Sequence, residues 1–150
     1  MTSRKRILPP IYFLAALFLM VGLSFLLPFR KLIPSPYNWI GLLPIALGAA
    51  INIWASGHFA KIQTPIKPFE RSTHLVSVGL YKYTRNPMYL GMVIILGGVG
   101  LLLGSLSPFL VIPVFIWLIQ RNFIPAEEKM LEEVFGDDYL DYKSHVRRWL

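Results

Sequence analysis

The sequence contains no cysteine, which excludes a disulfide scaffold and a thiolate metal site. Charge is also scarce. Charged residues make up 15% of the chain, with 8 Asp and Glu against 15 Lys and Arg, whereas ordinary soluble domains carry roughly 25%. A water-soluble globule is therefore not expected, and a hydrophobic share of 55% excludes a disordered chain. A small integral membrane protein remains, and 150 residues support a single domain.

Long apolar stretches are present instead, because residues 7–29, 32–60 and 86–120 contain no Lys, Arg, Asp or Glu. The first would reach about 34 Å as a helix, enough to cross a bilayer. The prolines at 34 and 36 delay the second helix to about residue 38. The third would be about 52 Å long, so it must fold back, and Gly104 to Pro108 is the natural break. We expect an all-α, polytopic membrane protein with four spans, at 7–29, 38–60, 88–103 and 107–123, and a tail at 124–150.

The basic residues predict the orientation of these spans. With the N-terminus in the cytoplasm, every Lys and Arg except Arg30 and Lys31 falls on the inner side, including the cluster from Arg4 to Arg6. All eight acidic residues fall there too. This asymmetry follows the positive-inside rule. It predicts a multi-pass protein with both termini in the cytoplasm, in the inner membrane if the source is bacterial. The excess positive charge then faces anionic lipid, and no nucleic-acid partner is expected.

The tail is predicted to be structured. Pro125 can begin a helix and Gly136 can end it at Phe135. Asp137 can cap another helix, in which aromatic and apolar residues recur at helical spacing as far as Trp149. We expect that last helix to run through Trp149 along the membrane surface.

The first candidate motif is the run from Gly79 to Gly91, Gly-Leu-Tyr-Lys-Tyr-Thr-Arg-Asn-Pro-Met-Tyr-Leu-Gly. It stands where a polar loop becomes an apolar helix and offers three tyrosines, Arg85 and Asn86. Such a junction can present phenol rings and a guanidinium to a ligand in the headgroup layer. Spacing alone favours a plainer interpretation, a loop with an aromatic belt, as most membrane proteins have.

The second candidate is the pair Glu127 and Glu128, just beyond the last span. Carboxylates at the start of a helix also interact favourably with the helix dipole, and this effect alone would explain the pair. The two arms of the predicted hairpin are neighbours, however, so Arg85 and Glu127 lie at ends that meet. A cation and an anion that converge in this way fit a small zwitterion, such as an amino-acid moiety.

Other polar and small residues predict packing. Gly98, Gly100 and Gly104 lack the dinucleotide-binding spacing and favour close helix contact. His58, His74 and His145 have no ligand spacing, so no metal site is expected.

The two motifs together resemble a known family. Arg85-Asn86-Pro87-Met88-Tyr89 and Glu127-Glu128 are similar to the Arg-His-Pro-x-Tyr and Glu-Glu consensus of the isoprenylcysteine carboxyl methyltransferase and phospholipid methyltransferase family. The stretch from Phe135 to Tyr142 resembles that family's C-terminal region. The resemblance covers roughly residues 60 to 150 and implies one membrane methyltransferase-like domain that uses S-adenosyl-L-methionine.

The resemblance also implies site residues. It places the cofactor between the hairpin and the tail. Arg85, Asn86 and Tyr89 are the implied catalytic residues, and the implied cofactor-binding residues are Tyr81, Tyr83, Arg85, Pro87, Tyr89, Glu127 and Glu128. Asn86 departs from the family's histidine and cannot act as a base.

We therefore expect methyl transfer to a lipophilic or lipidated acceptor at the cytoplasmic face of the bilayer. Because a carboxylate is a nucleophile without losing a proton, the acceptor is predicted to be most like a prenylcysteine carboxylate. A phospholipid amine is the alternative acceptor. A non-catalytic adaptor that binds anionic lipid or a partner, and a small lipid reductase, are alternative functions. The oligomeric state is left open by the sequence.

Overall fold

The computed structural model describes residues 8–28, 30–61 and 74–150, with side chains placed for these residues except 59–61. The basic cluster from Arg4 to Arg6, both ends of the predicted first span, and the charged residues between 62 and 73 lie outside this description. The described part is all-α. Its elements are α1 (Pro9–Leu26), η1 (Tyr37–Gly41), α2 (Leu42–Lys61), η2 (Gly79–Lys82), α3 (Pro87–Leu103), η3 (Ser107–Leu110), α4 (Val111–Asn122), α5 (Ile124–Phe135) and α6 (Asp137–His145).

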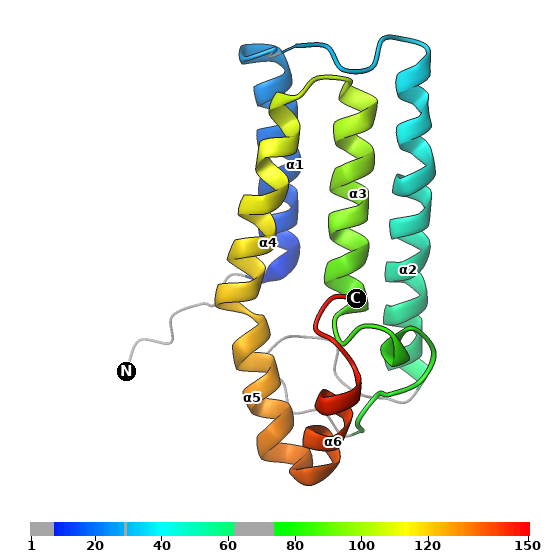
Figure 1. Ribbon diagram of the computed structural model, residues 1–150, viewed down its shortest axis with the longest axis vertical. Coiled ribbons are helices and arrows are strands. Elements are labelled where there is room, and N and C mark those ends of the chain that lie inside the picture. Colours follow the sequence, from blue (N-terminus) through cyan, green and yellow to red (C-terminus); the bar gives the residue numbers. More distant parts are fainter. Residues whose placement is uncertain (1–7, 29, 62–73) are drawn as a thin grey trace.

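Four helices run side by side, with α3 in the middle and α5 and α6 extending beyond one end of the bundle (Figure 1). Helix α3 contacts α1, α2 and α4. The apolar core lies between α1, α3 and α4, where Met20, Leu96 and Ile119 are completely buried. The Arg85 and Glu127 motifs lie at the α5 and α6 end, because one immediately precedes α3 and the other lies in the first turn of α5.

Proline and glycine set the ends of these helices. Pro87 and Pro125 stand in the first turns of α3 and α5, where a missing N–H costs nothing. Gly104 ends α3 with a φ of 70°, a left-handed conformation that glycine adopts readily. Its carbonyl accepts hydrogen bonds from the N–H groups of Leu32 and Ile33. The chain therefore folds back at the predicted break.

Within the described ranges, three helical stretches are long and apolar enough to cross a membrane: Pro9–Leu26, Tyr37–His58 and Ser107–Phe135. Helix α3 is also apolar but shorter, about 26 Å at 1.5 Å per residue. Large apolar side chains cover the outside of these helices, with Phe18, Phe25 and Ile53 more than 70% exposed. Such a surface suits lipid rather than water. The protein is thus an all-α, polytopic membrane protein.

The third stretch is apolar in its first half and charged in its second half. Its charged residues all lie from Arg121 onward, so the apolar segment ends with α4, and α5 stands outside it. The extent of each membrane span remains a prediction.

Glycines bring α2 and α3 into backbone contact. A Cβ atom at Gly98 would lie 2.6 Å from the carbonyl oxygen of Gly41, and one at Gly48 would lie 2.5 Å from that of Gly91. No side chain fits in these gaps. The close helix packing predicted at Gly98 and Gly100 is confirmed, since a Cβ atom at Gly100 would meet the ring of Phe109 at 2.9 Å. This packing fixes α3, and therefore the motif that precedes it, against α2.

Candidate functional site

The entry to α3 is held by the last residues of the chain. The backbone N–H of Arg85 donates to the carbonyl of Arg147 at 2.9 Å. The side chains of Thr84 and Asn86 both donate to the carbonyl of Arg148, at 3.2 and 2.9 Å. We call Val146–Leu150 the C-terminal strap. It crosses the Arg85 motif and closes one side of the candidate site.

The strap corrects one expectation from the sequence. The helix predicted to continue to Trp149 ends at His145, and Val146 is extended, with φ −116° and ψ 130°. The physical reason is that the carbonyls of Arg147 and Arg148 have donors in the Arg85 motif. These long-range hydrogen bonds replace the helical ladder, and the indole of Trp149 packs against the core between α1, α3 and α4.

Glu128 is at the centre of an ion cluster. Nη1 of Arg85 lies 3.1 Å from its Oε1. Arg148 binds both oxygens, with Nε 3.0 Å from Oε1 and Nη2 2.7 Å from Oε2. The side chains of Arg85 and Glu128 are only 11% and 10% exposed. The hydrogen bond to Glu128 raises the pKa of Arg148 above its usual range, and the two guanidiniums share one buried carboxylate.

Glu127 has a different environment, although it is the next residue. The hydroxyl of Tyr89 donates to its Oε1 at 2.6 Å, and no Lys or Arg forms an ion pair with it among the described residues. Burial raises the pKa of the Glu127 carboxyl to about 7, the hydrogen bond from Tyr89 opposes this rise, and the charge of Glu128 adds to it. The site therefore contains a partly buried carboxyl group that has no cation partner among the described residues.

Two buried donors also lack acceptors. Nε of Arg85 and Nε1 of Trp149 have no hydrogen-bond partner among the described residues. Because an unpaired buried donor is costly, these N–H groups are suited to bind a ligand that carries acceptor oxygens. The Nε–H of Arg85 is thus suited to an anionic group, and the Glu127 carboxyl, which forms no ion pair with a Lys or Arg among the described residues, is suited to a cationic one.

An aromatic group borders the site on the side of α2. Tyr81 is buried, and its carbonyl accepts a hydrogen bond of 2.7 Å from the hydroxyl of Tyr142. Its ring centroid lies 6.4 Å from that of Trp54, which in turn stacks on His58 at 5.4 Å. Gly79, with a φ of 61°, lies so close to Trp54 that a Cβ atom would sit 2.3 Å from the indole.

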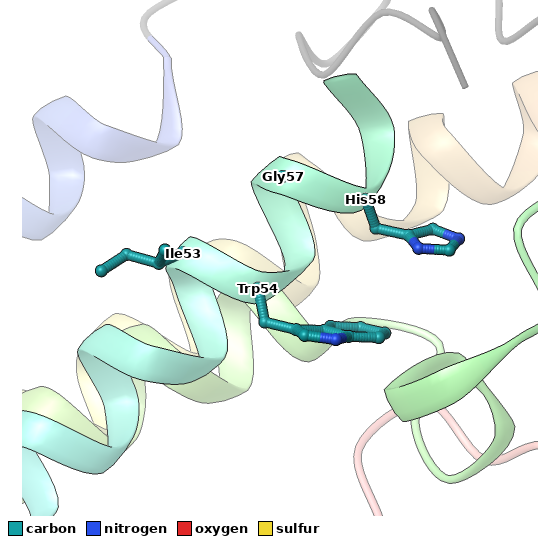
Figure 2. A pocket seen from close by; sticks show the side chains of 4 residues that line it. All are labelled: Ile53, Trp54, Gly57 and His58. Carbon is teal, nitrogen blue, oxygen red and sulfur yellow. The ribbon is translucent and has the colours of Figure 1, made fainter. Parts of the chain in front are cut away.

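A pocket of about 240 Å³ opens beside these rings and is lined by Ile53, Trp54, Gly57 and His58. Figure 2 shows the rings of Trp54 and His58 pointing to the same side of α2, toward the segment that contains η2. Trp54, one of the residues that line the pocket, is also the neighbour of Tyr81.

Most of the site residues predicted from the sequence lie together. Arg85 contacts Glu128, Tyr89 contacts Glu127, and Asn86 contacts the strap. Pro87 is fully buried at the start of α3, and Tyr81 is buried beside Trp54. Tyr83 differs from the others because it is 71% exposed. The catalytic and binding roles of these residues remain predictions.

The sequence reasoning missed several residues that the structure places at the site. From the sequence, Arg148 belongs only to the excess positive charge that is expected to face anionic lipid, and Trp54 falls in none of the candidate motifs. Tyr139, whose hydroxyl accepts a hydrogen bond of 3.5 Å from Nη1 of Arg85, was assigned to a surface helix. Only Tyr139 had a signal, since it falls in the C-terminal stretch that resembles the family. For Arg148 and Trp54 no spacing rule connects them to residue 85.

The chain resembles known methyltransferases. A family model described as phospholipid methyltransferase matches residues 37–138. A protein-S-isoprenylcysteine O-methyltransferase of Saccharomyces cerevisiae is 38% identical over 114 residues, which are 71% of this chain and 46% of that protein. Protein-S-isoprenylcysteine O-methyltransferase B of Arabidopsis thaliana is 30% identical over 113 residues, 72% of this chain and 57% of that protein.

A shorter protein matches as well. An uncharacterized protein of Haemophilus influenzae is 44% identical over 63 residues, which are 42% of this chain and all of that protein. The chain spans about half the length of the two isoprenylcysteine methyltransferases that it matches. The matched region includes both the Arg85 motif and the Glu127-Glu128 pair, since both fall within residues 37–138.

Proposed function

Because the chain belongs to the phospholipid methyltransferase family, we propose that it transfers a methyl group from S-adenosyl-L-methionine to a lipophilic acceptor at the cytoplasmic face of the membrane. The observation that carries this proposal is the partly buried Glu127 carboxyl group, which has no cation partner in the described chain and is adjacent to Glu128 of the Arg85–Glu128 ion pair. The cofactor would supply an electrophilic methyl group on a sulfonium.

In this proposal, different residues of the site bind different groups of the cofactor. Glu127 binds the ammonium group of the cofactor, and the Tyr89 hydroxyl, 2.6 Å away, holds that carboxylate in place. Arg85 binds the carboxylate of the cofactor through its unpaired Nε–H. Pro87 and Asn86 set the position of Arg85, Asn86 through its hydrogen bond to the strap. Fixed groups of this kind align two reactants and exclude water.

The pocket beside Trp54 is our candidate for the acceptor side. It opens on a lipid-facing helix, since Ile53 is 72% exposed. Trp54, which lines it, lies next to the buried Tyr81, with the ring centroids 6.4 Å apart. An apolar chain lying in the bilayer can therefore reach the site without leaving the membrane.

A carboxylate acceptor of isoprenylcysteine type is the acceptor that we favour. Asn86 provides no base, and its side-chain amide is already bonded to the carbonyl of Arg148. A carboxylate needs none, because it is ionised at neutral pH. The similarity to the isoprenylcysteine O-methyltransferases of Saccharomyces and Arabidopsis supports the same acceptor class.

A phospholipid amine is the second candidate, favoured by one observation. A carboxyl group with a pKa of about 7 is suited to accept a proton at neutral pH. Glu127 could therefore deprotonate an ammonium before methyl transfer, and the matching family model is that of phospholipid methyltransferases.

The test uses purified protein in detergent and S-adenosylmethionine with a labelled methyl group. We expect label in a small farnesylated cysteine derivative with a free carboxylate, and none in phosphatidylethanolamine. The reverse result would favour the phospholipid amine. Calorimetry with S-adenosylhomocysteine provides the control, because folded protein that gives no binding heat would contradict the enzymatic proposal and favour an adaptor.

A further inference from the structure

Arg148 and Arg85 compete for the same carboxylate. Arg148 takes both oxygens of Glu128 in a bidentate contact, at 3.0 and 2.7 Å. Arg85 reaches only Oε1, through Nη1 at 3.1 Å. An arginine facing a free carboxylate usually forms two parallel N–H···O bonds. Arg85 makes only an ion-pair contact with one oxygen here, because Arg148 already binds both oxygens.

The incomplete contact leaves Arg85 with an available donor. Its Nε is buried and has no partner among the described residues, and its side chain is 11% exposed, so water does not satisfy this group freely. If Arg148 were removed, Oε2 of Glu128 would lose its partner. Glu128 could then rotate and accept two N–H groups of Arg85, which would draw the guanidinium away from a ligand.

The strap holds Arg148 at this position. The carbonyl of Arg148 accepts hydrogen bonds from Thr84 and Asn86, which flank Arg85 in the sequence. The preceding carbonyl accepts the N–H of Arg85 itself. Trp149, on the other side of Arg148, packs against the apolar core. The backbone of the strap is therefore fixed on both sides of Arg148. This position allows the side chain of Arg148 to contact Glu128 directly.

We infer that Arg148 is a positioning residue, which holds Glu128 so that Arg85 keeps an N–H free for the carboxylate of the cofactor. This inference rests on the proposed function, because it assigns the ligand group that the free N–H binds. Arg148 does not touch the ligand and acts through Glu128. The C-terminal strap is accordingly part of the binding site and not a dispensable tail.

The experiment compares Arg148→Ala, Arg148→Lys and the control Lys129→Ala in the full chain in detergent. The side chain of Lys129 is 78% exposed on α5, so its replacement removes the same charge outside the site. Calorimetry measures the affinity of each protein for S-adenosylhomocysteine and for its decarboxylated analogue, S-adenosyl-3-thiopropylamine. These two ligands differ in the carboxylate alone.

We expect Arg148→Ala to lose at least about tenfold in affinity for S-adenosylhomocysteine, the scale of one charge-assisted hydrogen bond, and to lose little for the decarboxylated analogue. Arg148→Lys keeps the charge but not the bidentate contact and is expected to lie between. Lys129→Ala is expected to match the original protein for both ligands.

Two results would overturn the inference alone. The first is an equal loss for both ligands, which would mean that Arg148 merely supports the fold. The second is an unchanged preference for the carboxylate in Arg148→Ala. If the original protein bound neither ligand, the proposed function would fail, and the role of Arg148 would fail with it.

Discussion

Replacing Glu127 by glutamine is expected to weaken cofactor binding and, at the same time, to stabilise the protein above neutral pH. The substitution keeps the shape of the side chain and an acceptor oxygen for the Tyr89 hydroxyl, which lies 2.6 Å from the carboxyl group. It removes a carboxylate that has no cation partner in the described chain.

The pKa of Glu127 gives the size and the sign of the effect on stability. Folding raises this pKa from 4.5 to about 7, and such a difference corresponds to about 3 kcal/mol. Between these two values the folded state binds a proton that the unfolded state releases. The free energy of unfolding is therefore not reduced by this group at low pH, where its carboxyl is protonated in both states. It falls as the pH rises from about 4.5 to about 7 and stays reduced above pH 7. Glutamine avoids this cost.

The effect on binding has the opposite direction. A hydrogen bond to a charged group contributes about 1.5–3 kcal/mol, so Glu127→Gln is expected to bind S-adenosylhomocysteine roughly 10- to 150-fold more weakly. Calorimetry in detergent measures the affinity, and thermal unfolding at pH 6 and pH 8 measures the stability. The control is Glu133→Gln, on the same helix, with a side chain 65% exposed in an i,i+4 pair with Lys129. It is expected to change neither quantity by more than about 0.5 kcal/mol.

Unchanged affinity in Glu127→Gln would remove Glu127 from the binding site. A lower stability of this variant at pH 8 would show that the carboxylate is not an uncompensated charge. Either result would contradict this prediction, because both effects depend on the same partly buried carboxyl group without a cation partner in the described chain.

Four further predictions follow from the described contacts. Cofactor affinity is expected to rise between pH 6 and pH 8 as Glu127 loses its proton near pH 7, and Glu127→Gln is expected to show no such rise in calorimetry. Tyr89→Phe removes the 2.6 Å hydrogen bond to Glu127 and is expected to weaken cofactor binding several-fold, whereas Tyr83→Phe, at a residue 71% exposed, is expected to bind normally. Gly98→Ala puts a methyl group 2.6 Å from the carbonyl of Gly41 and is expected to cost about 1–3 kcal/mol in thermal unfolding, whereas the neighbouring Gly97→Ala has open space and is expected to be neutral or stabilising. Trp54→Ala is expected to raise KM for the lipophilic acceptor in the labelled-methyl assay while S-adenosylhomocysteine affinity stays the same, and a normal KM would place the acceptor elsewhere.

The sequence by itself determined the fold class, because that depends on the length and composition of local stretches. An uncharged run of 35 residues, 86–120, exceeds the thickness of a bilayer and contains its own break at Gly104, so a hairpin followed without reference to other parts of the chain. The hairpin also predicted that the two motifs are close together, because Arg85 precedes its first arm and Glu127 and Glu128 follow its second arm. Two ordered motifs were enough to indicate the family.

The tertiary structure alone decided how the charges are paired. Glu127 and Glu128 are adjacent, yet successive residues on a helix point about 100° apart, so one faces Tyr89 and the other faces two arginines. A pattern of two acidic letters cannot distinguish these environments. The strap is the second example: its residues have helical spacing, but donors from Thr84, Arg85 and Asn86 bind its carbonyls. Those partners lie more than 60 residues away in the chain, where no local propensity extends, and only folding brings Arg148 to Glu128.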